Sequence, residues 1–128
     1  MPCLCLYEVN CYLQPEAKAE FLIFLDTHAQ ELLKLKGFMR AHVYEPEEDC
    51  NCPKGAVTVT VQYEVLTRAN LEHYFENEAP AMKAETISKF GSKIVGSTRR
   101  IIKVNKHLNR KIPLSVQCCM FLSGVLSS

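Results

Sequence analysis

One segment of the chain alternates apolar and polar residues more strictly than any other. Between residues 57 and 65 every second side chain is valine or tyrosine, and the side chains between them are threonine, glutamine or glutamate. Because successive side chains of a β-strand point to opposite faces, this pattern predicts a strand with one buried face and one polar face. We therefore expect a strand over residues 56–66, within a sheet that is covered on one side only.

Three other segments are expected to complete this sheet. Residues 4–13 and 38–45 both alternate in character, and residues 93–104 follow the last expected helix as a further strand. The stretch at 46–55 is acidic, bounded by proline and poor in apolar residues. It is expected to be a hairpin loop between two neighbouring strands.

Two helices are expected between the strands. The first begins at Pro15, carries apolar residues at helical spacing, and ends at Gly37. The second begins after Thr67, whose hydroxyl can cap it. Pro80 lies inside the apolar pattern of this second helix and is expected to kink or split it near Ala79.

The order of these elements predicts the fold class. Strand, helix, strand, strand, helix, strand is the βαββαβ order of a ferredoxin-like α+β domain. Its four-stranded antiparallel sheet would carry both helices on one face, and the domain is expected to span residues 1–104. A C-terminal extension of uncertain order would follow at residues 105–128.

A polar pocket is expected between the sheet face without helices and the second helix. Its candidate ligand-binding residues combine carboxylate, amide and imidazole groups with tyrosines, and one arginine could hold an anion. Alternation allows only one of Arg99 and Arg100 onto this face, and Arg99 is placed in the candidate set. The set is Glu8, Asn10, Tyr12, His42, Tyr44, Gln62, Glu64, Tyr74 and Arg99.

The alternative for the same residues is a paired polar network in an interface between two copies. The face is too mixed for a normal core and too aromatic for a solvated surface. A second sheet that covers it would explain both properties, so we expect a homodimer.

Charge and cysteines restrict the other function classes. A net charge of +1 argues against nucleic-acid binding, and no apolar run reaches the roughly 18–20 residues of a membrane span. The seven cysteines are odd in number and follow no expected secretory signal, which favours free thiols and the cytoplasm. The pairs Cys3/Cys5 and Cys50/Cys52 lack the usual spacing of zinc ligands, and no cofactor motif appears, so neither a metal nor a cofactor is expected.

The extension after residue 104 has two interpretations. A basic cluster at residues 106–111 precedes a charge-free stretch from Ile112 to Ser128. The extension would pack on the domain or on a partner, or stay partly disordered. Alternatively, it would contact a membrane surface, with Cys118 and Cys119 as acylation sites.

Several segments together resemble a family of uncharacterised domains in the dimeric α/β-barrel superfamily. They are YEVN at 7–10, the helix that starts at Pro15, KGF at 36–38, VTVQY at 59–63, and the stretches 71–85 and 89–101. The resemblance covers residues 4–104 and implies a ferredoxin-like fold with sheet-to-sheet dimers. It implies no activity. Relatives in the wider superfamily include antibiotic-biosynthesis-type monooxygenases and haem-degrading enzymes, which is analogy of fold alone.

Two functions therefore remain open. The first is a homodimeric module that binds a small ligand or is purely structural, without catalysis. The alternative is a cofactor-independent enzyme of monooxygenase or isomerase type, with His42 and either Glu8 or Glu64 as its acid–base groups. A cavity of several hundred Å³ lined by His42, Glu64 and an arginine would favour the enzyme, whereas a dry interior would favour the structural module.

Overall fold

The structure is a computed structural model that describes residues 4–113. The described chain forms four strands, three α-helices and two short 3₁₀ helices, and the expected order of elements is confirmed. The bounds are β1 Cys5–Leu13, η1 Pro15–Ala17, α1 Lys18–Leu32, β2 Phe38–Tyr44, β3 Val57–Val65, α2 Arg68–Asn77, α3 Ala79–Phe90, η2 Gly91–Lys93 and β4 Ile94–Lys103.

The four strands form one antiparallel sheet in the order β2-β3-β1-β4. In β1, Glu8 lies between Gln62 of β3 and Arg100 of β4, while its neighbour Val9 lies between Val61 and Arg99. Since paired residues share a face, this register assigns every strand residue to one side of the sheet.

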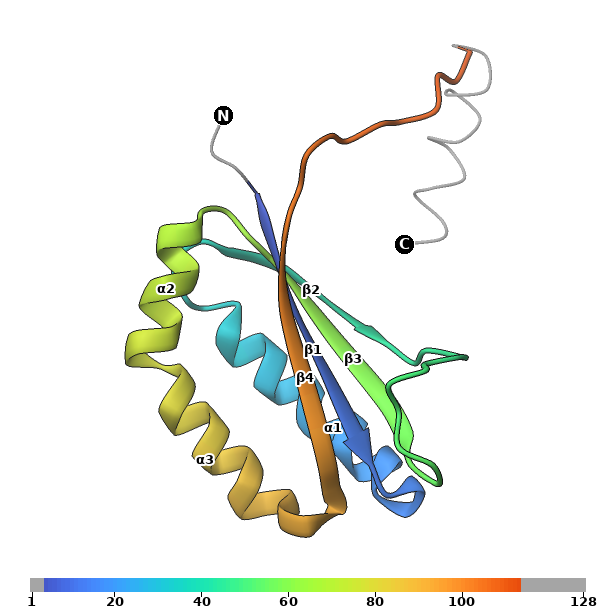
Figure 1. Ribbon diagram of the computed structural model, residues 1–128. Coiled ribbons are helices and arrows are strands. Elements are labelled where there is room, and N and C mark those ends of the chain that lie inside the picture. The colour runs from blue at the N-terminus through green and yellow to red at the C-terminus, as the bar shows by residue number, and fades with distance from the viewer. Residues whose placement is uncertain (1–3, 114–128) are drawn as a thin grey trace.

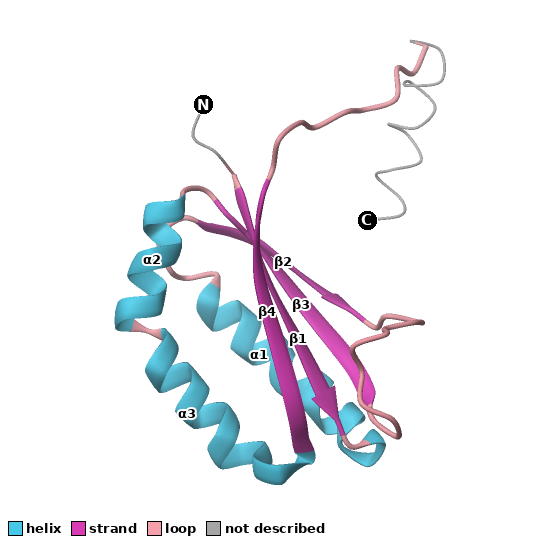
Figure 2. Cartoon of the chain, in the orientation of Figure 1, coloured by secondary structure: helices cyan, strands magenta, loops and turns pink. Residues whose placement is uncertain are grey.

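All three α-helices cover the same face of the sheet (Figures 1 and 2). The ferredoxin-like fold, a four-stranded sheet with a helix layer on one side, is therefore as the sequence predicts. We call the covered side the helix side and the uncovered side the open face.

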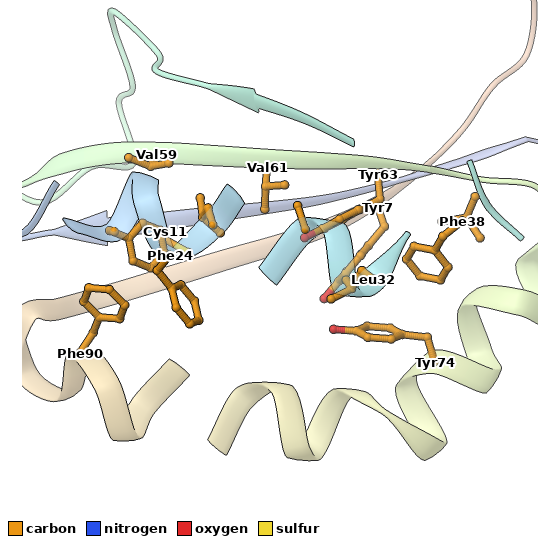
Figure 3. Packing of buried hydrophobic residues seen from close by; sticks show 14 of the residues in the cluster. Tyr7, Cys11, Phe24, Leu32, Phe38, Val59, Val61, Tyr63, Tyr74 and Phe90 are labelled. Carbon is orange, nitrogen blue, oxygen red and sulfur yellow. The ribbon is translucent and has the colours of Figure 1, made fainter. Parts of the chain in front are cut away.

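The hydrophobic core lies between the sheet and the helices, as Figure 3 shows. Phe21 of α1 is almost fully buried and meets Phe90 of α3 edge to face, with ring centroids 5.0 Å apart. Val59 and Val65 of β3 are fully buried beneath the helices. The alternating valines thus provide the floor of the core, as their spacing predicts.

The second expected helix is split where Pro80 predicts. The helix α2 ends at Asn77, and α3 begins at Ala79 with Pro80 in its first turn, where its missing N–H costs no helical bond. Thr67 caps α2, because its hydroxyl oxygen accepts a hydrogen bond from the backbone N–H of Asn70 at 3.1 Å.

The connection from α1 to β2 depends on a glycine. Gly37 has a φ of +86°, which other residues rarely adopt, and a side chain there would collide with Asn70. The start of β2 is thus held against the N-terminus of α2, which fixes the helix layer over the sheet.

Residues 104–113 follow β4 without helix or strand and lead away from the sheet (Figure 1). Among residues 4–113, no helix is long and apolar enough to cross a membrane. The predicted acylation sites Cys118 and Cys119 lie outside the described residues.

Candidate functional site

Seven of the nine predicted site residues share the open face. Glu8, Asn10 and Tyr12 of β1 pair with Gln62, Thr60 and Thr58 of β3, and the polar residues of β2 continue the same rows. The seven are Glu8, Asn10, Tyr12, His42, Tyr44, Gln62 and Glu64.

Glu8 is the centre of a hydrogen-bonded network on this face. It accepts hydrogen bonds from Arg100 Nε at 2.6 Å, Asn10 Nδ2 at 3.2 Å and Gln62 Nε2 at 3.2 Å. The hydrogen bond from Arg100 is the main reason that the pKa of the Glu8 carboxyl is lowered. Glu8 therefore stays ionised and paired, which makes it a weak candidate for a general base.

The other open-face residues are also partnered. The Tyr12 hydroxyl lies 3.0 Å from the Thr98 hydroxyl, and Asn10 accepts a hydrogen bond from Thr60. His42 stacks on Tyr44 and is 3.9 Å from a Glu64 carboxylate oxygen. A hollow of about 570 Å³ lies over this face, but neither His42 nor Glu64 lines it. The cavity that would favour the enzyme is therefore not found among the described residues of this face.

One predicted residue, Tyr74, lies on the helix side instead, whereas Arg99 lines hollows on both sides of the sheet. Tyr74 belongs to α2, and its ring packs against Tyr7 and Phe38 in the core. Arg99 pairs with Val9, which gives it a helix-side position in the strand, but its side chain lines the open-face hollow as well as the helix side. Arg100 is the arginine that faces Glu8. The expected placement of Tyr74 was wrong because α2 covers the face opposite the polar rows. Both arginines line the open-face hollow, so alternation alone did not decide which of them reaches it.

A cavity of about 300 Å³ lies between the helix side of the sheet and the helices. Its apolar wall comes mostly from α1 and α3, and its polar groups come from β1, β3, β4 and all three α-helices. Its polar and titratable lining residues include Tyr7, Cys11, His28, Tyr63, Tyr74 and Arg99.

Tyr63 carries a buried hydroxyl without a hydrogen-bond partner among the described residues. Its side chain is 1% exposed, and its ring stacks on Tyr7 with centroids 6.1 Å apart. Figure 3 shows Tyr7, Tyr63 and Tyr74 with their rings directed into the space between sheet and helices. An unsatisfied buried hydroxyl is costly and calls for an explanation, and a ligand group that would bond to it is one such explanation.

Burial changes the titration of the groups around this cavity. It raises the pKa of Tyr74 to about 12 and that of Cys11 to about 11, so both keep their protons near neutral pH. It also lowers the pKa of His28, whose ring stacks on Phe24. The cavity thus offers neutral donors rather than an ionised nucleophile.

The sequence contained a signal for this cavity that the open-face hypothesis did not use. Tyr7 and Tyr63 are tyrosines at core-facing positions of adjacent strands, where phenylalanine would serve as well for packing. His28 lies on the apolar stripe of α1, a position that by itself is typical of a satisfied core histidine. Polar tips at several core-facing positions together predict a lined cavity better than any one of them.

The chain matches the family described as "Domain of unknown function (DUF4286)" over residues 4–104. It belongs to this family. The match confirms the predicted resemblance to an uncharacterised family and assigns no activity. No curated protein matches the chain.

Solved structures of similar fold support the architecture. A putative antibiotic biosynthesis monooxygenase from Nitrosomonas europaea has 10% identity and a TM-score of 0.62, covering 81% of this chain and 92% of its own. SnoaB, a cofactor-independent oxygenase from Streptomyces nogalater that was solved as a mutant, has 12% identity and a TM-score of 0.61, covering 83% of this chain and 98% of its own.

A haem-degrading protein from Mycobacterium tuberculosis, MhuD, has 15% identity and a TM-score of 0.57, covering 81% of this chain and 99% of its own. At these identities the likeness establishes the ferredoxin-like fold of monooxygenase-type proteins and nothing about activity.

Proposed function

We propose that this chain is a small-molecule-binding module that holds its ligand in the helix-side cavity. The observation that carries this proposal is a cavity of about 300 Å³ lined by Tyr63, a residue whose buried hydroxyl has no hydrogen-bond partner among the described residues. That volume is at the lower end of the usual range of ligand pockets, about 300–1,000 Å³. A bound polar group would satisfy the hydroxyl and exclude water from the aromatic walls.

Proteins of the same fold are consistent with such a use. The solved structure of MhuD has two haems bound in its active site, and SnoaB is an oxygenase. We do not place catalysis on His42 and Glu8, because Arg100 already holds Glu8 as a paired carboxylate. Binding without assigned chemistry is the function that the geometry supports best.

Blocking the cavity tests this function. Ser97 of β4 lines the cavity, whereas the next residue, Thr98, lies on the open face. We expect Ser97→Phe to fill the cavity and to weaken the binding of the fluorescent probe 8-anilinonaphthalene-1-sulfonate at least about tenfold. This corresponds to about 1.4 kcal/mol of lost apolar contact.

Thr98→Phe is the matched control, since it adds the same ring to the opposite face of the same strand. The probe should bind this variant within twofold of the wild type. Equal loss in both variants, or a wild type that binds no probe, would overturn the proposed function.

We also propose that the open face joins two copies in a homodimer. Tyr44 is 46% exposed on a sheet face that no helix of the described chain covers, and a second sheet would bury it. Size-exclusion chromatography with light scattering at micromolar concentration should give twice the 14.5 kDa mass of one chain. A monomer at that concentration excludes the dimer.

The protein is proposed to work in a reducing compartment such as the cytoplasm. Cys11, Cys50 and Cys52 are free thiols in the structure. Thiol titration of protein purified without reductant should find these three thiols reduced, and stable disulfides at those positions would contradict the assignment.

A further inference from the structure

The helix-side cavity is cationic as well as apolar. Arg99 and Lys83 line it, and none of its described lining residues is an aspartate or a glutamate. Glu78 and Glu85 act on Tyr74 and His28 from behind the wall, but both charged residues that line the cavity are cations. Such a lining favours an anionic ligand over a cationic one.

Among residues 4–113 the guanidinium of Arg99 makes no ion pair or side-chain hydrogen bond, and it lines the open-face hollow as well as this cavity. Its neighbour Arg100 differs sharply, because Arg100 donates two hydrogen bonds to Glu8, at 2.6 and 3.3 Å. The positive charge of Arg99 opposes the effect of burial on the pKa of Tyr7, Cys11 and Tyr74, so the guanidinium lies close to the cavity's polar groups. The guanidinium of Arg99 is therefore available to a ligand in the cavity.

The deeper polar groups are hydrogen-bond donors. Burial raises the pKa of Tyr63 and of Tyr7, so both phenols remain protonated at neutral pH. The Tyr63 hydroxyl is unpartnered among the described residues and fully buried. A buried donor on a residue that lines a cavity with cations is suited to an anionic oxygen, the strongest acceptor available.

The walls of the cavity are aromatic. Tyr7 and Tyr63 stack with an interplanar angle of 22°, and Phe24 stacks on His28 at 26°. Flat rings on facing elements leave flat apolar surfaces, which contact a planar ligand better than a branched one.

We infer that the cavity takes an aromatic molecule with one anionic oxygen group, whose charge Arg99 holds and whose oxygen accepts the hydrogen bond of Tyr63. This inference rests on the proposed binding function and names its ligand class. Carboxylates and acidic phenols share the required chemistry.

A double comparison of ligand charge and protein charge tests this assignment. Naphthalene-2-carboxylate and its neutral amide, naphthalene-2-carboxamide, are titrated calorimetrically into the wild type, Arg99→Gln and Arg100→Gln. We expect the wild type to prefer the carboxylate about tenfold, as a charge-assisted hydrogen bond would give. Arg99→Gln should remove this preference and leave the affinity for the amide within twofold.

Arg100→Gln is the matched control, because it removes the same charge from the adjacent residue on the opposite face. It should leave both affinities within twofold. Tyr63→Phe provides a second readout, with an expected loss of about fivefold for the carboxylate.

The outcomes separate the two proposals. If both probes bind the wild type equally, or if Arg99→Gln leaves the carboxylate preference intact, the inferred ligand class is wrong while the binding function stands. If neither probe binds the wild type, and the anilinonaphthalene probe also fails, the binding function itself is wrong.

Discussion

The two faces of this sheet use the same residue types for opposite purposes. Arg99 and Arg100 are neighbours on β4, and Tyr12 and Tyr63 lie on adjacent strands, yet one of each pair is partnered and the other is not. On the open face the polar groups bond to one another. On the helix side they line a cavity, where these two lack partners among the described residues. Because buried polar groups are normally hydrogen-bonded, unpartnered polar side chains in a core indicate a binding site more strongly than a paired polar network on a surface does.

The largest expected difference between the faces is in stability. Phe21→Ala should lower the free energy of unfolding by about 3–5 kcal/mol, because it leaves a void among the buried rings of Phe24 and Phe90. Tyr44→Ala on the open face should cost the monomer less than about 1 kcal/mol. Urea unfolding at two protein concentrations measures both costs and separates any contribution of a dimer.

Similar costs for the two substitutions at the lower concentration would contradict this difference. They would mean that the open face contributes to the core of a single chain.

The ion pair between Glu8 and Arg100 on the open face should make the stability depend on pH. The pKa of Glu8 is lowered below its ordinary value of 4.5, mainly by the hydrogen bond from Arg100. A carboxyl whose folded pKa is lowered stabilises the fold above its unfolded pKa, and this contribution is lost as the pH falls through the folded pKa. Glu8→Gln should therefore cost about 1–2 kcal/mol at pH 7, a range that allows for solvent screening of the pair, and progressively less below pH about 4.5.

Urea unfolding between pH 7 and pH 3 gives the free energy of unfolding as a function of pH for the wild type and for Glu8→Gln. Glu72→Gln is the control, since Glu72 makes an exposed ion pair with Arg68 on α2 and should change the curve far less. If the curve of Glu8→Gln stays parallel to that of the wild type across this range, the ion pair contributes nothing to the acid dependence.

The smallest expected effect has opposite signs on the two faces. Tyr12→Phe removes a hydroxyl that is hydrogen-bonded to Thr98 and should cost about 0.5–1 kcal/mol. Tyr63→Phe removes an unpartnered hydroxyl, so the ligand-free protein should be as stable as the wild type or more stable, by up to about 1 kcal/mol. Thermal unfolding of the two variants beside the wild type makes this comparison.

The predicted difference would be contradicted if ligand-free Tyr63→Phe lost as much stability as Tyr12→Phe. The Tyr63 hydroxyl would then have a partner, and the main support for the binding site would be lost.

The fold could be predicted closely from the sequence because its signals are local. The alternation of Val57 to Val65, the cap at Thr67 and the break at Pro80 each act within a few residues and agree with one another. The domain boundary near residue 104 remains a prediction, although β4 ends at Lys103.

The site could be predicted only in part, because it depends on which elements face each other. Alternation was enough to predict which residues of β1, β2 and β3 share the open face. The face on which Arg99 lies depends on the register of β4 against β1, which alternation does not give. The unpartnered hydroxyl of Tyr63 depends on three-dimensional packing, and no pattern of spacing reports it.

If ligands bind in the helix-side cavity and not on the open face, the tyrosines of the two faces should report it directly. The chain has five, with Tyr7, Tyr63 and Tyr74 at the cavity and Tyr12 and Tyr44 on the open face. In protein labelled with 3-fluorotyrosine, each ¹⁹F signal is assigned by a Tyr→Phe variant and followed during titration with naphthalene-2-carboxylate. We predict that the three cavity signals shift while the two open-face signals stay in place, and shifts confined to Tyr12 and Tyr44 would contradict the account.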